Sequence, residues 1–300
     1  MQPPKTKTAR HHWWPEGVSD FWKGDDGRCE QLMITDGKLK AVRSYPRQFG
    51  AIGNGHCIKF GGPWDTSFES EFDSADSNFP TIINSISSLE RRENHNNKLQ
   101  DRLHAQHIDS SFREKLMTCM SSLIARSPRT RNKISLRTER DRNKFGLSSN
   151  KKDLELLVAA NLRGLHPRLS KLMLHGGKIA ALYSDNHEFI FGDGFFNTLP
   201  ISRVTNGEAM CLLPLTPWVT ILFFRQSAYF RNPELVTIVL NETEVAFINE
   251  ITQACSCKFI YYRHQRPEIT KAFMSERYFD IEDYEATWLG SLVTSVQSLR

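Results

Sequence analysis

The apolar pattern of the chain changes its period twice, and this limits the folds that the chain can adopt. Residues 28–35 and 38–45 are strand-like and flank Asp36-Gly37, a dipeptide that favours a two-residue type I′ turn. Between residues 80 and 163 the apolar side chains recur at helical spacing, and from residue 178 strand-like runs return. We therefore expect a mixed α/β protein of the α+β class, with an N-terminal β-hairpin region, central helices, and a C-terminal antiparallel or mixed sheet with a packed helix.

Local signals predict where several of these elements begin and end. Pro80 is placed at the first turn of a helix, an apolar stripe over residues 112–124 predicts a helix that ends near Ser127-Pro128, and residues 153–163 predict a helix that Gly164 ends. The later part predicts four elements: a hairpin of residues 178–184 and 188–191, one long strand over 211–224, a helix opened by the capping box Asn241 to Glu244, and a final strand over 258–262.

The length of 300 residues is enough for a large core without metals or disulfides. We expect one domain over residues 1–300, strand-rich over 1–63, helical over 64–175, and formed by a sheet with a helix over 176–300. The six cysteines form no CxxC pair, so buried free thiols are expected. The polar start of the chain has no signal-peptide pattern, and two prolines interrupt its longest apolar run, so we expect a cytoplasmic protein with no membrane partner.

Positive charge is concentrated in one segment. Residues 126–152 contain ten Lys or Arg and two acids, whereas the rest of the chain carries a net charge of −3. Such a segment can follow the phosphates of DNA or RNA, and a solvated loop or helix face is the alternative. The candidate nucleic-acid-binding side chains are Arg126, Arg129, Arg131, Lys133, Arg137 and Arg140.

Histidines and acids supply the candidate catalytic and metal-binding groups. His11 and His12 are adjacent, so in an extended segment they point to opposite faces and only one readily enters a given site, as a general base or as a metal ligand. Asp193 lies at a strand end between two glycines, where a site carboxylate or a turn-forming Asp is typical. Glu69 and Asp73 share a helical face and could hold a divalent cation, although a solvated first helical turn also explains them.

Several common enzyme motifs are absent from the sequence. It contains no Walker loop, no dinucleotide-binding glycine fingerprint, no Gly-x-Ser-x-Gly elbow and no HExxH motif. These absences disfavour nucleotide-driven motors, common dehydrogenases, serine hydrolases and zincins.

Short motifs follow one another along nearly the whole chain. They are His-His-Trp-Trp-Pro at 11–15, an acidic helix start at 69–73, Arg-Ser-Pro-Arg at 126–129, a strand that ends in Asp193, Pro-Leu-Thr-Pro at 214–217, and Asn249 on the last predicted helix. In this order they resemble the bacterial family called domain of unknown function 4238, whose members carry a His-His-Tyr-Val-Pro run and a Pro-Leu-Ser-Pro-like strand start. The chain departs from that pattern at Trp13 and Trp14 and lacks a Pro after Asp193.

The family has no established activity, so the resemblance implies candidate positions rather than a reaction. These positions are His11, His12, Asp193 and Asn249. Our first hypothesis is a phosphodiester-cleaving nuclease of the toxin or phage-defence type. Its partner would be DNA or RNA, and a divalent cation is a possible cofactor. The alternative is a non-enzymatic nucleic-acid-binding or regulatory protein in which the His and Asp motifs are structural, and a hydrolase of a small phosphorylated metabolite is a third. An active site requires His11 or His12 to meet Asp193 or the acidic cluster in a cleft.

Overall fold

The strands of the described residues form one large sheet and three smaller ones. The computed structural model describes residues 10–53, 55–59, 65–92, 98–147, 150–199, 209–225, 232–280 and 287–299. Helices and strands intermix throughout these residues, which confirms the predicted α+β class. None of the described helices is both long enough and apolar enough to cross a membrane.

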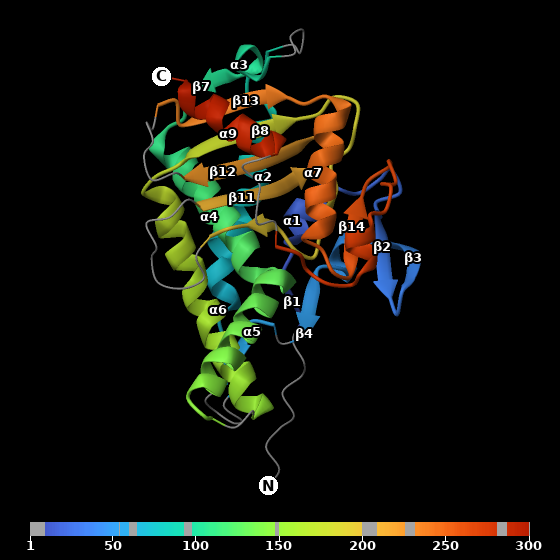
Figure 1. Cartoon of the computed structure of the whole chain (residues 1–300), viewed down its shortest axis with the longest axis vertical. Helices are drawn as coiled ribbons and strands as arrows, with labels where there is room; N and C mark the ends of the chain where they lie inside the picture. Colours follow the sequence, from blue (N-terminus) through green and yellow to red (C-terminus); the bar gives the residue numbers. More distant parts are fainter. Residues whose placement is uncertain are drawn as a thin grey trace.

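The large sheet has six strands in the order β10-β11-β12-β8-β13-β7 (Figure 1). Its only parallel pair within the described residues is β8 with β13, and the other neighbours are antiparallel. In chain order the strands are β7 His104–Gln106, β8 Lys178–Tyr183, β10 Phe196–Asn197, β11 Ala209–Thr216, β12 Val219–Arg225 and β13 Leu235–Val239.

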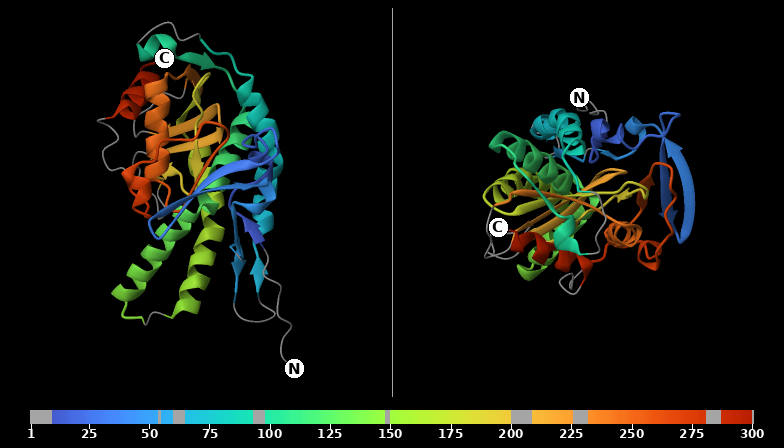
Figure 2. Two further views of the ribbon diagram at one scale, coloured as in Figure 1. Left: turned by 90° about the vertical axis from the view of Figure 1, so that its right-hand side faces the viewer. Right: turned by 90° about the horizontal axis from the view of Figure 1, so that it is seen from above.

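Helices cover both faces of this sheet (Figure 2). Three helices lie on one face and two on the other. Strand β8 lies between these two layers, and all of its residues are buried. The three helices are α2 Asp73–Ser87, α4 Ser110–Arg126 and α6 Lys151–Leu174, whereas α7 Glu242–Ala254 and α9 Trp288–Ser298 lie on the other face.

A four-stranded sheet in the order β3-β2-β14-β9 lies beside α7 (Figure 1). Its hairpin is the one that the sequence predicts, since Asp36 and Gly37 have φ angles of 50° and 71° at the turn, as a type I′ turn requires. The strands are β2 Cys29–Thr35, β3 Lys38–Ser44, β9 Phe191–Gly192 and β14 Phe259–Tyr262.

Two small antiparallel strand pairs, a long helical hairpin and several short helices complete the fold. The helix α5, Pro128–Lys144, runs back along α6, and the pair projects from the body of the molecule (Figure 2). The small strands are β1 Arg10–His12 with β4 Ala51–Gly53, and β5 Cys57–Ile58 with β6 Thr66–Ser67. The short helices are α1 Glu16–Ser19, η1 Pro46–Gln48, η2 Glu69–Phe72, α3 Leu99–Arg102 and α8 Lys271–Met274.

Two predicted helix boundaries are wrong. Pro80 lies inside α2 rather than in its first turn, because η2 and α2 begin eleven and seven residues before it. The helix α6 continues past Gly164 and through Pro167 to Leu174. Its buried side chains, which include Leu165 and Leu169, pack along α4, and this tertiary burial outweighs the local preference of Gly and Pro to end a helix.

Two predicted strand arrangements are also wrong. The apolar run predicted as one strand forms two, β11 and β12, which pair across a turn at Pro217 and Trp218. The predicted hairpin of residues 178–184 and 188–191 does not form, because β8 pairs with β12 and β13 while β9 pairs with β14 in the other sheet. Strands that are buried on both faces have no alternation of polar and apolar residues, so their sequence does not show where one strand ends or which strand it pairs with.

The N-terminal segment packs against residues from the C-terminal half. The ring of Trp14 stacks on Phe191 at 3.9 Å between ring centres, and Trp13 lies against Tyr261. The indole Nε1 of Trp22 donates to the carbonyl of Leu215 at 2.9 Å. All six cysteines are free, and four of them are buried, as expected.

Candidate functional site

Three side chains with metal-ligand chemistry meet where the small strand pairs join. Strand β1 pairs with β4, which places His11 opposite Ile52 and beside the turn that carries His56. Strands β5 and β6 then pair, and the N–H of Phe68 donates to the carbonyl of His56 at 2.9 Å. This pairing brings Glu69, the first residue of η2, next to His56.

The ligand atoms of His11, His56 and Glu69 all lie within 4.8 Å of one another. The backbone N–H of His56 donates to Nδ1 of His11 at 2.8 Å, and Nδ1 of His56 contacts the Glu69 carboxylate. The two imidazole rings stack with 5.3 Å between their centres and 6° between their planes. Both histidines are buried, whereas the Glu69 side chain is 34% exposed and forms the solvent side of the cluster. We call these three residues the His–Glu cluster.

The protonation states of His56 and Glu69 favour metal binding. Burial lowers the pKa of His56 and outweighs the opposing effect of its hydrogen bond with Glu69, so the imidazole is neutral at neutral pH. Burial alone would raise the pKa of Glu69, but the hydrogen bond with His56 and the neighbouring positive charges lower it, so the carboxyl is ionised. A neutral imidazole and an ionised carboxylate are the forms that bind a cation. Nδ1 of His11 has one lone pair, which already accepts the N–H of His56, so a cation bound through this atom would have to displace that hydrogen bond.

The separations suit a single small transition-metal ion. In a tetrahedral zinc site with bonds of about 2.0–2.1 Å, neighbouring ligand atoms lie about 3.3 Å apart, so ligand atoms that lie within 4.8 Å of one another would have to approach by up to about 1.5 Å to close around the ion. Two His and one carboxylate are the ligand set of catalytic zinc sites, which leave a position open for water or substrate, and of non-haem iron sites. Within the described residues no other group of three such side chains meets this distance.

Aromatic and basic side chains surround the His–Glu cluster. The ring of His56 lies 5.5 Å from that of Phe68 and 5.0 Å from that of Phe72, and these contacts exclude water from one side of the imidazole. The guanidinium of Arg131, on α5, donates to the carbonyl of Gly55 directly before His56. Burial lowers the pKa of Arg131. The basic helix is therefore joined to the turn that carries His56.

His12 does not enter the cluster. Its carbonyl accepts from Arg126 at 3.4 Å, and its Nε2 is buried with no hydrogen-bond partner in the described part of the chain. Adjacent residues of a strand point to opposite faces, and only His11 of the pair lies beside His56 and Glu69.

Asp193 and Asn249 hold the backbone together at another place. The carboxylate of Asp193 accepts from the N–H groups of Cys257 and Lys258 at 2.8 and 3.1 Å and from the hydroxyl of Tyr278 at 3.2 Å. Asn249 donates to the carbonyl of Glu188 and accepts from the N–H of Ile190. The polar contacts of Asp193 and His11 have no residue in common, so the structure does not bring the predicted His and Asp together.

Most of the predicted nucleic-acid-binding side chains are already engaged within the protein. Arg126 is bound by Asp76, Arg129 by Asp280 and two carbonyls, and Lys133 by Asp280. Only Arg137 and Arg140 of the six are exposed. The expectation of six phosphate-binding side chains is therefore reduced to these two positions on the outer face of α5.

Of the two acids predicted as metal ligands, the structure places one in the His–Glu cluster and one outside it. Glu69 belongs to the His–Glu cluster, whereas Asp73, one helical turn later, is exposed and lies outside it. The sequence analysis missed His56, which lies in a glycine-containing segment interpreted as a loop. Its position as the nearest histidine before the acidic residues 65–76 is the one signal that pointed to it.

Comparison of the chain with known protein families, with curated proteins and with solved structures finds no match. The evidence on function therefore comes from the chemistry of the residues themselves.

Proposed function

We propose that the chain is a metal-dependent phosphodiesterase that acts on nucleic acid, with its centre at His11, His56 and Glu69. The convergence of these three side chains from a strand, a turn and a short 3-10 helix carries the proposal. Two imidazoles and one carboxylate bind a cation and leave part of its coordination sphere free for water and substrate. Membership in the family of domain of unknown function 4238 is likewise a proposal.

Each residue around the proposed centre has a separate role in this proposal. A divalent cation bound there would polarise a phosphoryl oxygen and lower the pKa of a water molecule towards neutrality. Glu69 faces solvent and gives the substrate access, while Phe68 and Phe72 keep the rear of His56 dry. Arg131 fixes the turn before His56 and thus acts as a positioning residue.

The outer face of α5 supports a polymeric substrate. Arg137 and Arg140 follow Arg131 by six and nine residues, which places them about 9 and 14 Å further along the helix axis. Exposed guanidinium groups at such intervals suit successive phosphates of a nucleic acid strand, and their binding would weaken with salt.

The contacts of His11 favour a second candidate function. Its Nδ1 already accepts the N–H of His56, so the cluster can hold β1 in place without a metal. In that case the chain would be a non-enzymatic nucleic-acid-binding or regulatory protein, and the contacts of Asp193 and Asn249 would be part of the same structural role.

A cleavage assay separates the two candidates. Single-stranded and double-stranded DNA and RNA would be incubated with the purified chain, with chelator, and with Zn²⁺, Mn²⁺ or Mg²⁺ added back. The proposal expects cleavage that chelator abolishes and that His56→Ala and Glu69→Gln each reduce by at least about 100-fold. His107→Ala, which changes an exposed histidine outside the cluster, is the matched control and should keep full activity. Binding without cleavage under every metal condition would favour the second candidate.

A further inference from the structure

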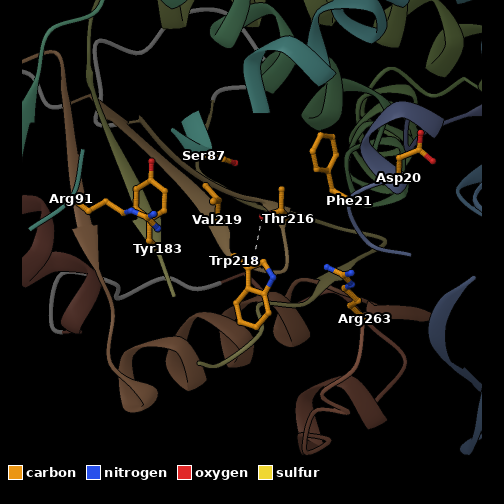
Figure 3. Close-up of a pocket in the computed structure, with 9 residues that line it drawn as sticks. All are labelled: Asp20, Phe21, Ser87, Arg91, Tyr183, Thr216, Trp218, Val219 and Arg263. Atoms are coloured by element: carbon orange, nitrogen blue, oxygen red, sulfur yellow. Dashed lines mark hydrogen bonds between the residues drawn. The ribbon is translucent and has the colours of Figure 1, made fainter. Parts of the chain in front are cut away.

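A cavity of about 340 Å³ lies beside the turn between β11 and β12 (Figure 3). Its lining residues come from five separate parts of the chain and include none of the His–Glu cluster. The volume is at the lower end of the range for small-molecule sites, which is about 300–1,000 Å³. It can therefore take a ligand of modest size.

Arg263 supplies a partly buried cation whose Nε has no hydrogen-bond partner among the described residues. Its Nε is buried without a hydrogen bond, and no hydrogen bond or ion pair of this side chain occurs among the described residues. A buried donor left unpaired costs about 1–3 kcal/mol, and a guanidinium stays charged at any pH that a protein tolerates. An anion bound in the cavity would satisfy it.

Arg91 supplies a second cation from another side. Its guanidinium lies over the ring of Tyr183, 4.7 Å from the ring centre, and its pair with Asp185 is long, at 3.9 Å, and solvent-exposed. Figure 3 shows Arg91 and Arg263 at opposite ends of the lining, with Trp218 and Thr216 between them. An anionic group would thus meet positive charge at either end of the cavity.

Trp218 supplies an aromatic face in the middle. It is only partly buried, and its backbone N–H donates to the hydroxyl of Thr216 at 3.1 Å, which fixes the turn that presents the indole. Rings of bases stack on such a face with little dependence on sequence. The hydroxyls of Ser87 and Thr216 add polar groups close to it.

The one acid in the lining does not cancel these charges. Asp20 pairs with Lys23 at 2.8 Å, and Figure 3 shows its carboxylate turned away from Trp218. The cavity therefore favours a ligand that is anionic and also aromatic.

We propose that this cavity binds a nucleoside monophosphate, with the base stacked on Trp218 and the phosphate on an arginine. The site is separate from the His–Glu cluster and does not depend on the proposed phosphodiesterase activity. It would give the chain a small-molecule ligand in addition to any polymeric substrate.

Calorimetric titration tests this proposal with adenosine monophosphate as the probe and adenosine and inorganic phosphate as separate arms. The expected result is binding of the nucleotide that Arg263→Met weakens at least tenfold and that Trp218→Ala also weakens, with each isolated part binding less tightly than the whole. Arg91→Met provides a second charge variant should Arg263→Met fail to fold. Arg277→Met is the matched control, because Arg277 also stacks on an aromatic ring, Phe279 at 4.4 Å, but does not line the cavity.

The same titration on His56→Ala with chelator present separates this site from the metal centre, since binding should be unchanged there. No binding of the nucleotide to the folded wild-type chain would overturn the proposal. Affinity equal to that of the wild type in both Arg263→Met and Arg91→Met, or loss of binding in His56→Ala, would overturn it as well. If Trp218→Ala binds the nucleotide as tightly as the wild type, the assignment of the base to the indole would be overturned.

Discussion

Arg126 is a buried structural cation, and this assignment leads to an asymmetric prediction for its ion pair with Asp76. Its guanidinium donates to both carboxylate oxygens of Asp76, at 3.0 and 2.6 Å, and lies 4.7 Å from the ring centre of Phe72. The Arg126 side chain is 0% exposed, whereas that of Asp76 is 37% exposed. Loss of the acid therefore leaves a charge that water cannot reach, while loss of the base leaves an acid that water can hydrate.

The two substitutions should differ in their effect on the free energy of unfolding. Asp76→Ala strands the guanidinium, which cannot lose its proton, and should cost about 3–5 kcal/mol. Arg126→Met keeps most of the buried volume and should cost less than about 1.5 kcal/mol. The double variant should be more stable than Asp76→Ala alone, because the stranded charge is removed.

Urea unfolding at neutral pH measures all three variants, and Asp73→Ala is the matched control because Asp73 is an exposed acid on the same helix. Asp73→Ala should lie within about 0.5 kcal/mol of the wild type. The reasoning fails if Asp76→Ala costs less than about 1 kcal/mol or if Arg126→Met is the more damaging change.

Three further predictions follow from individual contacts. Burial raises the pKa of Asp193 from 3.8 to about 6, so the folded state binds this proton more tightly than the unfolded state does. As the pH rises from 4 through 6, the stability of the wild type should therefore fall by about 3 kcal/mol relative to Asp193→Asn. Urea unfolding at several pH values measures this, and a stability difference that does not change with pH would contradict it. Gly194→Ala places its Cβ 2.0 Å from the carbonyl oxygen of Cys255 and should cost about 3 kcal/mol or more in thermal unfolding, whereas Gly164→Ala, which meets nothing closer than 3.8 Å, should not destabilise. Replacement of Arg137 and Arg140 by Glu should weaken DNA or RNA binding and flatten its salt dependence in fluorescence anisotropy titrations, and unchanged binding would remove α5 from the interface.

Local signals in the sequence predicted the elements that depend on neighbouring residues. Asp36-Gly37 specifies its hairpin turn through its backbone preferences, and Asn241 and Glu244 form the predicted capping box, with the Asn241 side chain accepting from the Glu244 N–H at 3.0 Å. These interactions span at most a few residues, so their chemistry is visible in the sequence.

Some elements that depend on distant partners were not predicted correctly. The turn at Pro217 and Trp218 has neither Gly nor Asn and lies between strands that are apolar on both faces, so Pro217 was the one local signal that divided β11 from β12, and the prediction of one strand did not use it. The helix α6 passes Gly164 because its packing against α4 favours continuation.

The candidate site shows the same division between local and distant information. Its two outer members, His11 and Glu69, were candidates because of residue type, but their meeting depends on two strand pairings, β1 with β4 and β5 with β6. His56 lies between those pairings and carries no motif of its own. Asp193 was attractive for its place at a strand end, and only the structure shows that backbone N–H groups of Cys257 and Lys258 occupy its carboxylate.

Metal binding by the purified chain tests the central claim most directly. After chelation and dialysis, Zn²⁺ and Co²⁺ would be titrated into the wild type, His56→Ala, Glu69→Gln and the control His107→Ala, with calorimetry, the cobalt absorption spectrum and thermal unfolding as the measurements. We expect one cation per chain in the wild type and the control, a tetrahedral or five-coordinate cobalt spectrum, and a gain of about 2.7 kcal/mol in stability at a free metal concentration 100 times the Kd. We also expect both cluster variants, while still folded, to bind at least about tenfold more weakly. A folded wild-type chain that binds neither ion, or binding that is equal in His56→Ala and the wild type, would contradict the assignment of His11, His56 and Glu69 as a metal centre.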